Sequence, residues 1–360
     1  MKMKKWASVF VAAAAVFALS ACGKNEKVDS SSEDIVTEIN EKTTINFWHA
    51  MNGAQEEALT KLTDDFMKEN PNIKVELQNQ SQYSDLQAKI NSTLPSPKDL
   101  PTITQAYPGW LWNAAQDEML VDLNPYIEND TIGWKDQEEI RDSLNNYYAI
   151  GMKNQGVDFD KDLALDGKES QKVIDYYAEG VKDGYFRIAG SDKYLSGPFA
   201  NEQVAMFVGS IAGEGYVKKD TEGKFEYGVA PRPEKINLQQ GTDIYMFSSA
   251  SAEKRTAAFE YMKFLAQPEN QLYWANMTGY MPIVESVLES DEYKNSTETK
   301  VPQYLEAATS DLFSIPVIEN ADPAYNEVRS IMENILSNTN QDTKKLIKDS
   351  VPQLEDAWNQ

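Results

Sequence analysis

The chain has 360 residues, enough for two domains, and its 41% hydrophobic and 25% charged residues are ordinary for a globular protein. A formal net charge of −23 argues against nucleic acid as a partner, because phosphate binding requires clustered Lys and Arg. One cysteine, Cys22, and one histidine, His49, exclude an intrachain disulfide and a multi-histidine or cysteine-rich metal site. The sequence has no Walker loop and no Gly-x-Ser-x-Gly elbow, so we expect no cofactor.

The first 42 residues have the composition of a targeting signal and a tether. A lysine-rich start precedes an apolar run from Val9 to Leu19, which is too short to span a bilayer comfortably. The next residues, up to Cys22, resemble the box of bacterial lipoproteins, in which the cysteine is lipidated and the chain is cleaved before it. We therefore expect a lipoprotein signal peptide at residues 1–21 and a lipidated Cys22 followed by a flexible polar tether at residues 22–42.

Residues 43–77 predict a βαβ unit. An apolar strand around Ile45–Trp48 is followed by Asn52-Gly53 and by a helix with apolar residues at four-residue spacing. Pro71 ends this helix, and Ile73–Leu77 alternates as a second strand, parallel to the first because a helix joins them. The first strand ends at Trp48–Met51, at the carboxyl edge where open α/β sheets bind ligands.

Apolar periodicity predicts several helices in the remainder of the chain. We expect them at residues 83–94, 172–182, 253–265, 271–277, 325–335 and 343–358.

Three segments, in their order along the chain, carry a resemblance to a known family. They are FWHAM at Phe47–Met51, ENPNIKV at Glu69–Val75 and MTGYMPI at Met277–Ile283. They resemble the extracellular solute-binding proteins that serve ABC importers, nearest to the branch that binds carbohydrates and glycerol phosphates. The resemblance implies an α/β, two-lobe periplasmic-binding-protein-like fold of type II, each lobe a mostly parallel sheet flanked by helices.

The same resemblance implies where further strands and the two lobes lie. It places strands at residues 100–107, 204–208, 225–231 and 241–248; the second is expected to be buried and the last to return to lobe one. Lobe one is expected at residues 43–142 plus 240–290, and lobe two at residues 143–239 plus 291–360.

Two strands of the family have no counterpart near residues 141–148. Glu138–Leu144 runs directly into Asn145–Gly151, which resembles a later part of lobe two. A natural compact member and an internal deletion both explain the gap, and the preserved spacing up to the join favours deletion. We expect an intact lobe one, a lobe two whose sheet lacks a central strand and a hinge crossing, and weak or absent ligand binding, because unpaired strand edges are costly.

The expected ligand site combines aromatic faces for sugar rings with polar groups for hydroxyls. His49 either contacts ligand or satisfies a loop carbonyl, and nothing nominates it as a catalytic base. Ser210 at a helix start suits a hydroxyl or phosphate, and Arg329 resembles an anion-clamping arginine of glycerol-phosphate-binding members, with a surface ion pair as its alternative. We expect no catalytic residues, and the expected ligand-binding residues are Trp48, His49, Tyr83, Gln105, Tyr107, Trp110, Ser210, Tyr245, Tyr280 and Arg329.

The function implied by the resemblance is capture of a carbohydrate between the lobes and its delivery to the permease subunits of an ABC importer. The protein is then a monomer, lipid-anchored at the extracytoplasmic face of a bacterial cell membrane, that acts by domain closure and not by catalysis. Alternatives are binding of glycerol 3-phosphate or a glycerophosphodiester, a surface glycoside hydrolase with a carboxylate pair, and a scaffold that binds no ligand.

Overall fold

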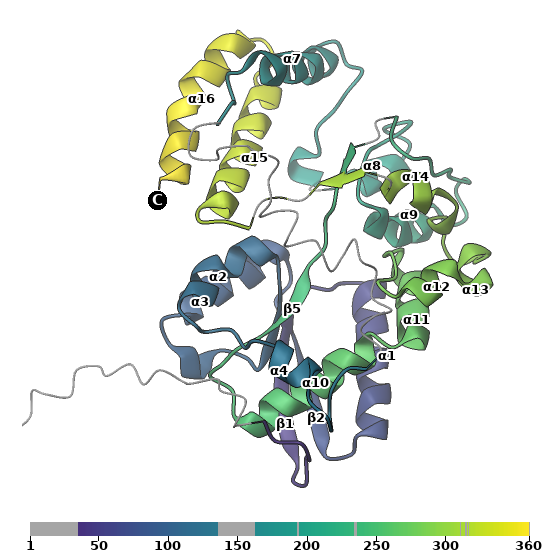
Figure 1. Cartoon of the computed structure of the whole chain (residues 1–360). Helices are drawn as coiled ribbons and strands as arrows, with labels where there is room; N and C mark the ends of the chain where they lie inside the picture. The colour runs from purple at the N-terminus through teal and green to yellow at the C-terminus, as the bar shows by residue number, and fades with distance from the viewer. Residues whose placement is uncertain are drawn as a thin grey trace, which may run out of the picture.

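The computed structural model describes residues 35–135, 163–192, 194–233, 236–309, 311–313, 315 and 317–359. The expected signal peptide, the lipidated Cys22 and the junction near residues 141–148 lie outside the described residues. Among the helices of the described part, none is long and apolar enough to cross a membrane. Figure 1 shows a sheet with flanking helices in the lower half and mostly helical elements in the upper half.

A four-stranded sheet organises the lower half, which corresponds to lobe one. The order is β2-β1-β3-β5, with β1 parallel to β2 and β3, and β5 antiparallel to β3. This topology confirms the predicted βαβ unit and the predicted return of a strand from lobe two. The strands are β1 (Thr43–His49), β2 (Ile73–Asn79), β3 (Ile103–Ala106) and β5 (Asp243–Met246).

Helices cover both faces of this sheet because side chains alternate along each strand. Ile45 and Phe47 pack with α1 and α10, whereas Trp48 packs on the other face with α2 and α3. The buried Tyr261 hydroxyl lies 2.6 Å from the Thr63 hydroxyl and so joins α10 to α1. The elements of this half are α1 (Ala54–Glu69), α2 (Tyr83–Thr93), η2 (Pro97–Asp99), η3 (Pro108–Leu111), α3 (Trp112–Gln116), α4 (Asn124–Ile127), α10 (Ala252–Leu265) and α11 (Pro268–Thr278).

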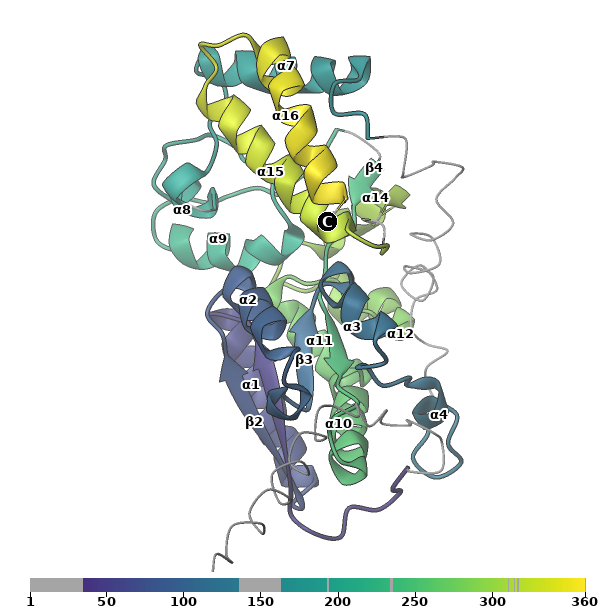
Figure 2. The same ribbon diagram turned by 90° about the vertical axis from the view of Figure 1, so that its left-hand side faces the viewer.

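The upper half contains two groups of elements, visible in Figures 1 and 2. One is a three-helix group of α7 (Lys168–Lys182), α15 (Ala321–Ser337) and α16 (Thr343–Trp358), which share an apolar cluster around Ile331 and Ile335. The other contains η5 (Gly190–Asp192), α8 (Ser196–Ala200), η6 (Ile211–Gly213), α9 (Glu214–Thr221), β4 (Ile236–Leu238), α14 (Leu305–Thr309) and β6 (Asp311–Phe313). Strands β4 and β6 form a parallel pair, the one sheet in the described residues of lobe two.

Two strands expected in lobe two are absent, so these predictions were wrong. Residues 204–208 form no strand and are not buried, since Met206 is 85% exposed and Val208 is 73% exposed. Residues 225–231 also have no regular secondary structure. A strand needs neighbours that pair with its backbone groups, and no strand of the described chain pairs with either segment.

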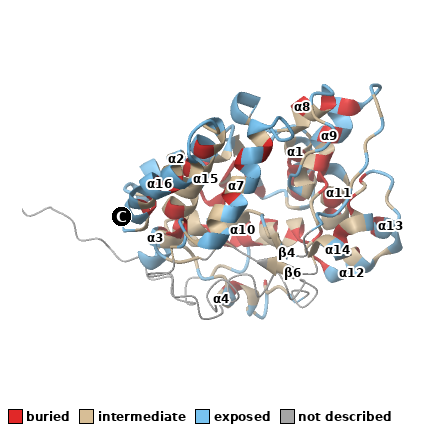
Figure 3. Cartoon of the chain, turned by 90° about the horizontal axis from the view of Figure 1, so that it is seen from above, coloured by how far each residue is buried: buried red, intermediate tan, exposed pale blue. Residues whose placement is uncertain are grey.

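A fourth apolar cluster joins the two halves. It contains Ala275 of α11, Val287 of α12 (Glu285–Glu289), Tyr293 of α13 (Asp291–Lys294) and Val301, which precedes η7 (Pro302–Tyr304). The lobe boundary expected between residues 290 and 291 falls inside this cluster. Viewed from above, the helices carry buried residues on one side and exposed residues on the other (Figure 3).

Candidate functional site

Four aromatic side chains that are far apart in the sequence form one group at the carboxyl edge of the lobe-one sheet. We call Tyr83, Tyr107, Trp110 and Tyr280 the aromatic cluster. Tyr83 opens α2, Tyr107 follows β3, and Trp110 lies in η3. The ring centroids of Tyr83 and Tyr107 are 5.6 Å apart, those of Tyr107 and Trp110 are 5.2 Å apart, and those of Tyr83 and Trp110 are 6.3 Å apart. All three pairs are edge-to-face, the arrangement that the aromatic quadrupole favours.

Tyrosine hydroxyls converge at one side of this cluster. The side chains of Tyr83 and Tyr280 are hydrogen-bonded, and burial followed by the nearness of other tyrosines raises the pKa of Tyr280 well above its usual range. Burial and the nearness of Tyr83 also raise the pKa of Tyr216, which comes from α9 in the upper half. The site therefore offers neutral hydroxyl groups beside aromatic faces at neutral pH.

Two residues of the upper half complete the surroundings of the cluster. The Tyr216 hydroxyl donates to the Asn52 carbonyl at 3.0 Å, just before α1 begins. Asp322, in the first turn of α15, accepts from Gln87 Nε2 at 2.7 Å and from the Trp110 side chain. Tyr216 and Asp322 were not predicted from the sequence. An acid in the first turn of a helix is an ordinary terminal residue, and a tyrosine on a short polar helix has no distinguishing local pattern.

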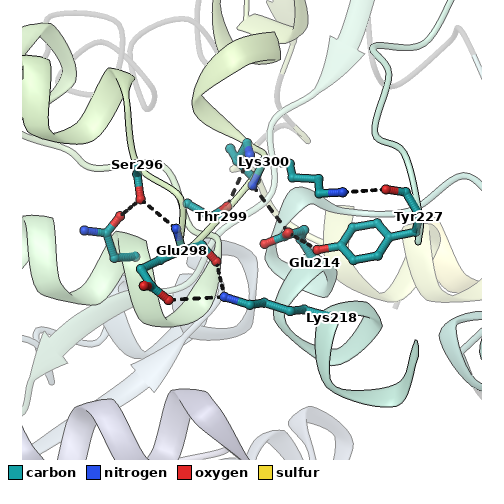
Figure 4. A network of polar contacts seen from close by, with 9 residues as sticks. Glu214, Lys218, Tyr227, Ser296, Glu298, Thr299 and Lys300 are labelled. Carbon is teal, nitrogen blue, oxygen red and sulfur yellow. Dashed lines mark hydrogen bonds and ion pairs between the residues drawn. The ribbon is translucent and has the colours of Figure 1, made fainter. Parts of the chain in front are cut away.

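A polar network joins α9, which carries Tyr216, to Tyr227 and to the segment at residues 296–300 (Figure 4). Glu214 is buried and accepts from the Tyr227 hydroxyl and from the Lys300 backbone N–H at 3.4 Å. Lys300 Nζ donates to the Tyr227 carbonyl at 2.5 Å and lies 4.2 Å from the centre of the Tyr227 ring. Burial, and then the Glu214 carboxylate, raise the pKa of Tyr227 well above its usual range.

Glycine at position 279 allows the end of α11 to approach Ile211 of η6 closely. Gly279 has a φ of 75°, in the left-handed region, and a Cβ there would lie 3.0 Å from the Ile211 carbonyl oxygen. Any larger residue would combine backbone strain with crowding between the end of α11 and η6.

Three expected ligand contacts at the sheet edge are buried: Trp48, His49 and Gln105. Trp48 donates from Nε1 to Gln78 Oε1 at 2.8 Å and lies under the ammonium group of Lys89. His49 is 1% exposed, and burial lowers its pKa, partly offset by Glu56. These contacts position the first strand.

Gln105 is also buried, and its side chain is hydrogen-bonded to other parts of the protein. Its Oε1 accepts from the Ala50 backbone N–H at 2.8 Å, and its Nε2 donates to the Thr242 hydroxyl at 2.7 Å. The side chain thus ties the end of β1 to the segment that enters β5. A direct ligand contact of Trp48, His49 or Gln105 stays a prediction.

The other expected contacts are distributed around the cluster. Tyr245 of β5 packs on the same apolar group as Tyr83 and Trp110. Ser210 is exposed and caps η6 by accepting from the Ala212 N–H at 3.3 Å. Arg329 is exposed on α15, and its charge is the smallest influence on Asp322, whose pKa is raised by burial. The structure therefore brings together the aromatic predictions and leaves Ser210 outside the cluster.

A small cavity of about 40 Å³ lies where the two halves meet next to Tyr216, between Gly53–Gln55 and Ala212–Lys219. A larger hollow of about 550 Å³ runs along the exposed side of α1, at Glu56–Lys68, away from the cluster. No group of three or more His, Cys, Asp or Glu side chains suited to a metal ion occurs in the described ranges.

Comparisons with known proteins identify the family of the chain. The model of a family described as bacterial extracellular solute-binding protein matches residues 61–141 and 129–301. The sn-glycerol-3-phosphate-binding periplasmic protein of Shigella dysenteriae is 27% identical over 164 residues, which are 43% of this chain. The match spans 37% of that relative, so the chain covers little more than a third of the curated relative's length.

Solved structures share the fold over most of the chain. One is a binding protein from Mycobacterium tuberculosis in complex with glycerophosphocholine, with a TM-score of 0.71, 16% identity, and coverage of 88% of this chain and 98% of that chain. Another is an ABC substrate-binding protein from Listeria monocytogenes in complex with cycloalternan, with a TM-score of 0.72, 16% identity, and coverage of 89% and 100%. These similarities confirm the type II two-lobe fold.

Proposed function

Since the chain belongs to the bacterial extracellular solute-binding protein family, we propose that it captures a carbohydrate between its lobes and delivers it to the membrane permease of an ABC importer. The observation that carries the proposal is the aromatic cluster, which presents ring faces and hydroxyl groups where the two lobes meet. A sugar ring has an apolar side that packs on aromatic faces, and its hydroxyl groups need neutral donors and acceptors.

Binding acts through domain closure and involves no catalytic step. Tyr107 and Trp110 belong to lobe one, whereas Tyr216 comes from lobe two, so a sugar that contacts both favours the closed arrangement by its differential affinity. The ligand-binding residues that we propose are the ten residues expected from the sequence together with Tyr216. No cofactor enters this mechanism, and the active species is proposed to be a monomer.

Binding of glycerol 3-phosphate is the second candidate, because the curated relatives carry that ligand in their names. In that case Arg329, seven residues after Asp322 on α15, supplies the positive charge. Arg329→Ala is then expected to abolish binding of the phosphate and only to weaken sugar binding.

Isothermal titration with glucose, maltose, maltotriose, cycloalternan and sn-glycerol 3-phosphate tests the proposal. We expect heat with at least one sugar, and an affinity roughly two- to tenfold lower for Tyr107→Ala, because an aromatic pair contributes about 0.5–1.5 kcal/mol beyond area burial and 1.4 kcal/mol is tenfold. Tyr185→Ala is the matched control, since Tyr185 is 83% exposed in lobe two. Binding of no sugar, or equal loss in both variants, would contradict the proposal.

We propose that Cys22 anchors the protein to the extracytoplasmic face of the membrane through lipid. Several buried acyl chains would hold it firmly, because each methylene contributes about 0.8 kcal/mol. Cys22→Ala should release the protein from the membrane fraction or leave it unprocessed. A membrane-bound variant of unchanged mature size would show that another segment anchors the chain.

We further propose the lobe division at residues 43–142 plus 240–290 and residues 143–239 plus 291–360, and a deletion near residues 141–148. The loss of a central strand would make closure poorly defined, and only the fraction of molecules with a competent cleft would bind. Sugar affinity is therefore expected to be weak, and the titration should use protein and sugar at high concentration.

A further inference from the structure

Asp322 is held in a fixed position beside the aromatic cluster. Its Oδ2 accepts from Gln87 Nε2 at 2.7 Å and from Asn326 Nδ2 at 3.2 Å, and the Trp110 side chain also hydrogen-bonds to the carboxylate. A Cβ on Gly109 would lie 3.2 Å from the Asp322 Cβ, so the first turn of α15 rests directly on the backbone before Trp110. These contacts hold the Asp322 carboxylate in place where the two lobes meet.

The charge of Asp322 is not cancelled by an ion pair in the described part of the chain. Burial raises the pKa of the Asp322 carboxyl, and the uncharged donors around it partly offset this rise. Gln87, Asn326 and Trp110 stabilise an ionised carboxylate without neutralising it. The amino-terminal end of α15 favours a negative charge in the same way. Arg329 is exposed further along α15, and its effect on Asp322 is the weakest of the influences there.

A negative charge at this position affects the affinity for the two candidate ligand classes in opposite directions. A sugar hydroxyl donates a hydrogen bond, and a carboxylate accepts it readily. A phosphate group carries negative charge, so a ligand packed on Trp110 would bring like charges within a few ångströms in a partly desolvated site. Four of the other side chains that we place at the site, Tyr83, Tyr107, Tyr216 and Tyr280, bring no positive charge to offset this repulsion. Arg329 is the cation among the residues that we place there, and it is exposed and has the weakest influence on Asp322.

We propose that Asp322 is the specificity-determining residue of the site, and that it selects uncharged polyhydroxylated ligands over phosphate monoesters. This inference rests on the proposed function, because it requires the ligand to occupy the aromatic cluster. It distinguishes the chain from relatives named for sn-glycerol 3-phosphate, with which it shares 27–28% identity over 163–166 residues.

Titration of sn-glycerol 3-phosphate into wild type, Asp322→Asn and Asp349→Asn tests the inference. Asn keeps an oxygen that accepts from Gln87 and Trp110 but removes the charge, and Asp349 is an exposed acid on α16 that controls for net charge. We expect Asp322→Asn to bind the phosphate at least about tenfold more tightly than wild type. Repulsion between two like charges at contact distance weakens binding by more than a factor of ten, and the substitution removes one of the two charges. Asp349→Asn should match wild type.

Titration of the same sugars into these three proteins distinguishes failure of the inference from failure of the proposed carbohydrate binding. Failure of every sugar to bind would contradict carbohydrate capture, yet a gain of phosphate binding confined to Asp322→Asn would still support the role of the charge. No gain in Asp322→Asn, or an equal gain in Asp349→Asn, overturns the inference whatever the sugars do. Wild type that already binds the phosphate more tightly than any sugar overturns both.

Discussion

Lobe one and lobe two differ in how completely their backbones are paired. Lobe one has four adjacent strands, with apolar clusters on both faces of the sheet. The described part of lobe two has a single two-stranded parallel pair, and Met206 and Val208 are exposed where a buried strand was expected. The difference shows that a sequence pattern for a strand yields a strand only where partner strands are present to pair with it.

The contrast also explains where the candidate site is located. Tyr83, Tyr107 and Trp110 are held by lobe one, because each follows or adjoins an element that packs on the complete sheet. Lobe two contributes Tyr216 and Asp322 from helices, which keep their own backbone hydrogen bonds without a sheet. Half of the site is therefore preformed, and the other half depends on helix packing.

The largest expected effect comes from truncating the lobe-one core. Phe66 is 1% exposed and contacts the rings of Tyr261 and Phe264, so Phe66→Ala should lower the free energy of unfolding by about 3–5 kcal/mol. Met206→Ala removes an apolar side chain from lobe two and should change it by less than about 0.5 kcal/mol, because Met206 is already in solvent. Urea denaturation followed by circular dichroism measures both.

Two results with these variants would contradict the difference in packing between the lobes. A loss of about 2 kcal/mol or more in Met206→Ala would mean that the segment is buried in solution, as the sequence predicted. A small effect of Phe66→Ala would mean that lobe one is loosely packed.

Much of lobe one could be predicted from the sequence, because its signals are local. The apolar run around Ile45–Trp48, the four-residue spacing that ends at Phe66 and the alternation at Ile73–Leu77 each predicted an observed element. Tyr83, Tyr107 and Trp110 were chosen as candidates because they stand at strand ends and loops matched to the family resemblance, and the structure brings their rings together.

The rest depended on contacts that no local pattern encodes. The segment at residues 204–208 has strand-like residues, but its pairing partners decide its structure. Asp322 and Gln87 are separated by 235 residues, so their hydrogen bond becomes visible only in the folded chain. The burial of His49 and Gln105 was missed because a strand end that was expected to face the ligand is covered by side chains of neighbouring elements.

A smaller effect is expected from the protonation of His49, which lies in lobe one. Burial lowers its pKa from the ordinary 6.5, so below that pH the unfolded chain binds a proton that the folded chain does not. Stability is therefore greatest above about pH 6.5 and falls as the pH decreases toward the lowered pKa, by at most about 1.4 kcal/mol per pH unit for one group. Urea denaturation between pH 7.5 and 5.5 measures the decline.

His49→Gln is the control for this titration. The difference in stability between wild type and His49→Gln should shrink as the pH falls, because only wild type carries the titrating group. A difference that is independent of pH would show that His49 is accessible to solvent and is free to protonate in the folded state.

Hydrogen–deuterium exchange, read by peptide along the chain, tests the contrast between the lobes most directly. Backbone amides paired in a complete sheet exchange only through large openings, whereas unpaired amides exchange quickly. We predict slow exchange for β1, β2 and β3 and fast exchange for residues 204–210 and 225–231. Exchange in residues 204–208 as slow as in β1 would contradict the contrast, because it would require a paired strand in lobe two.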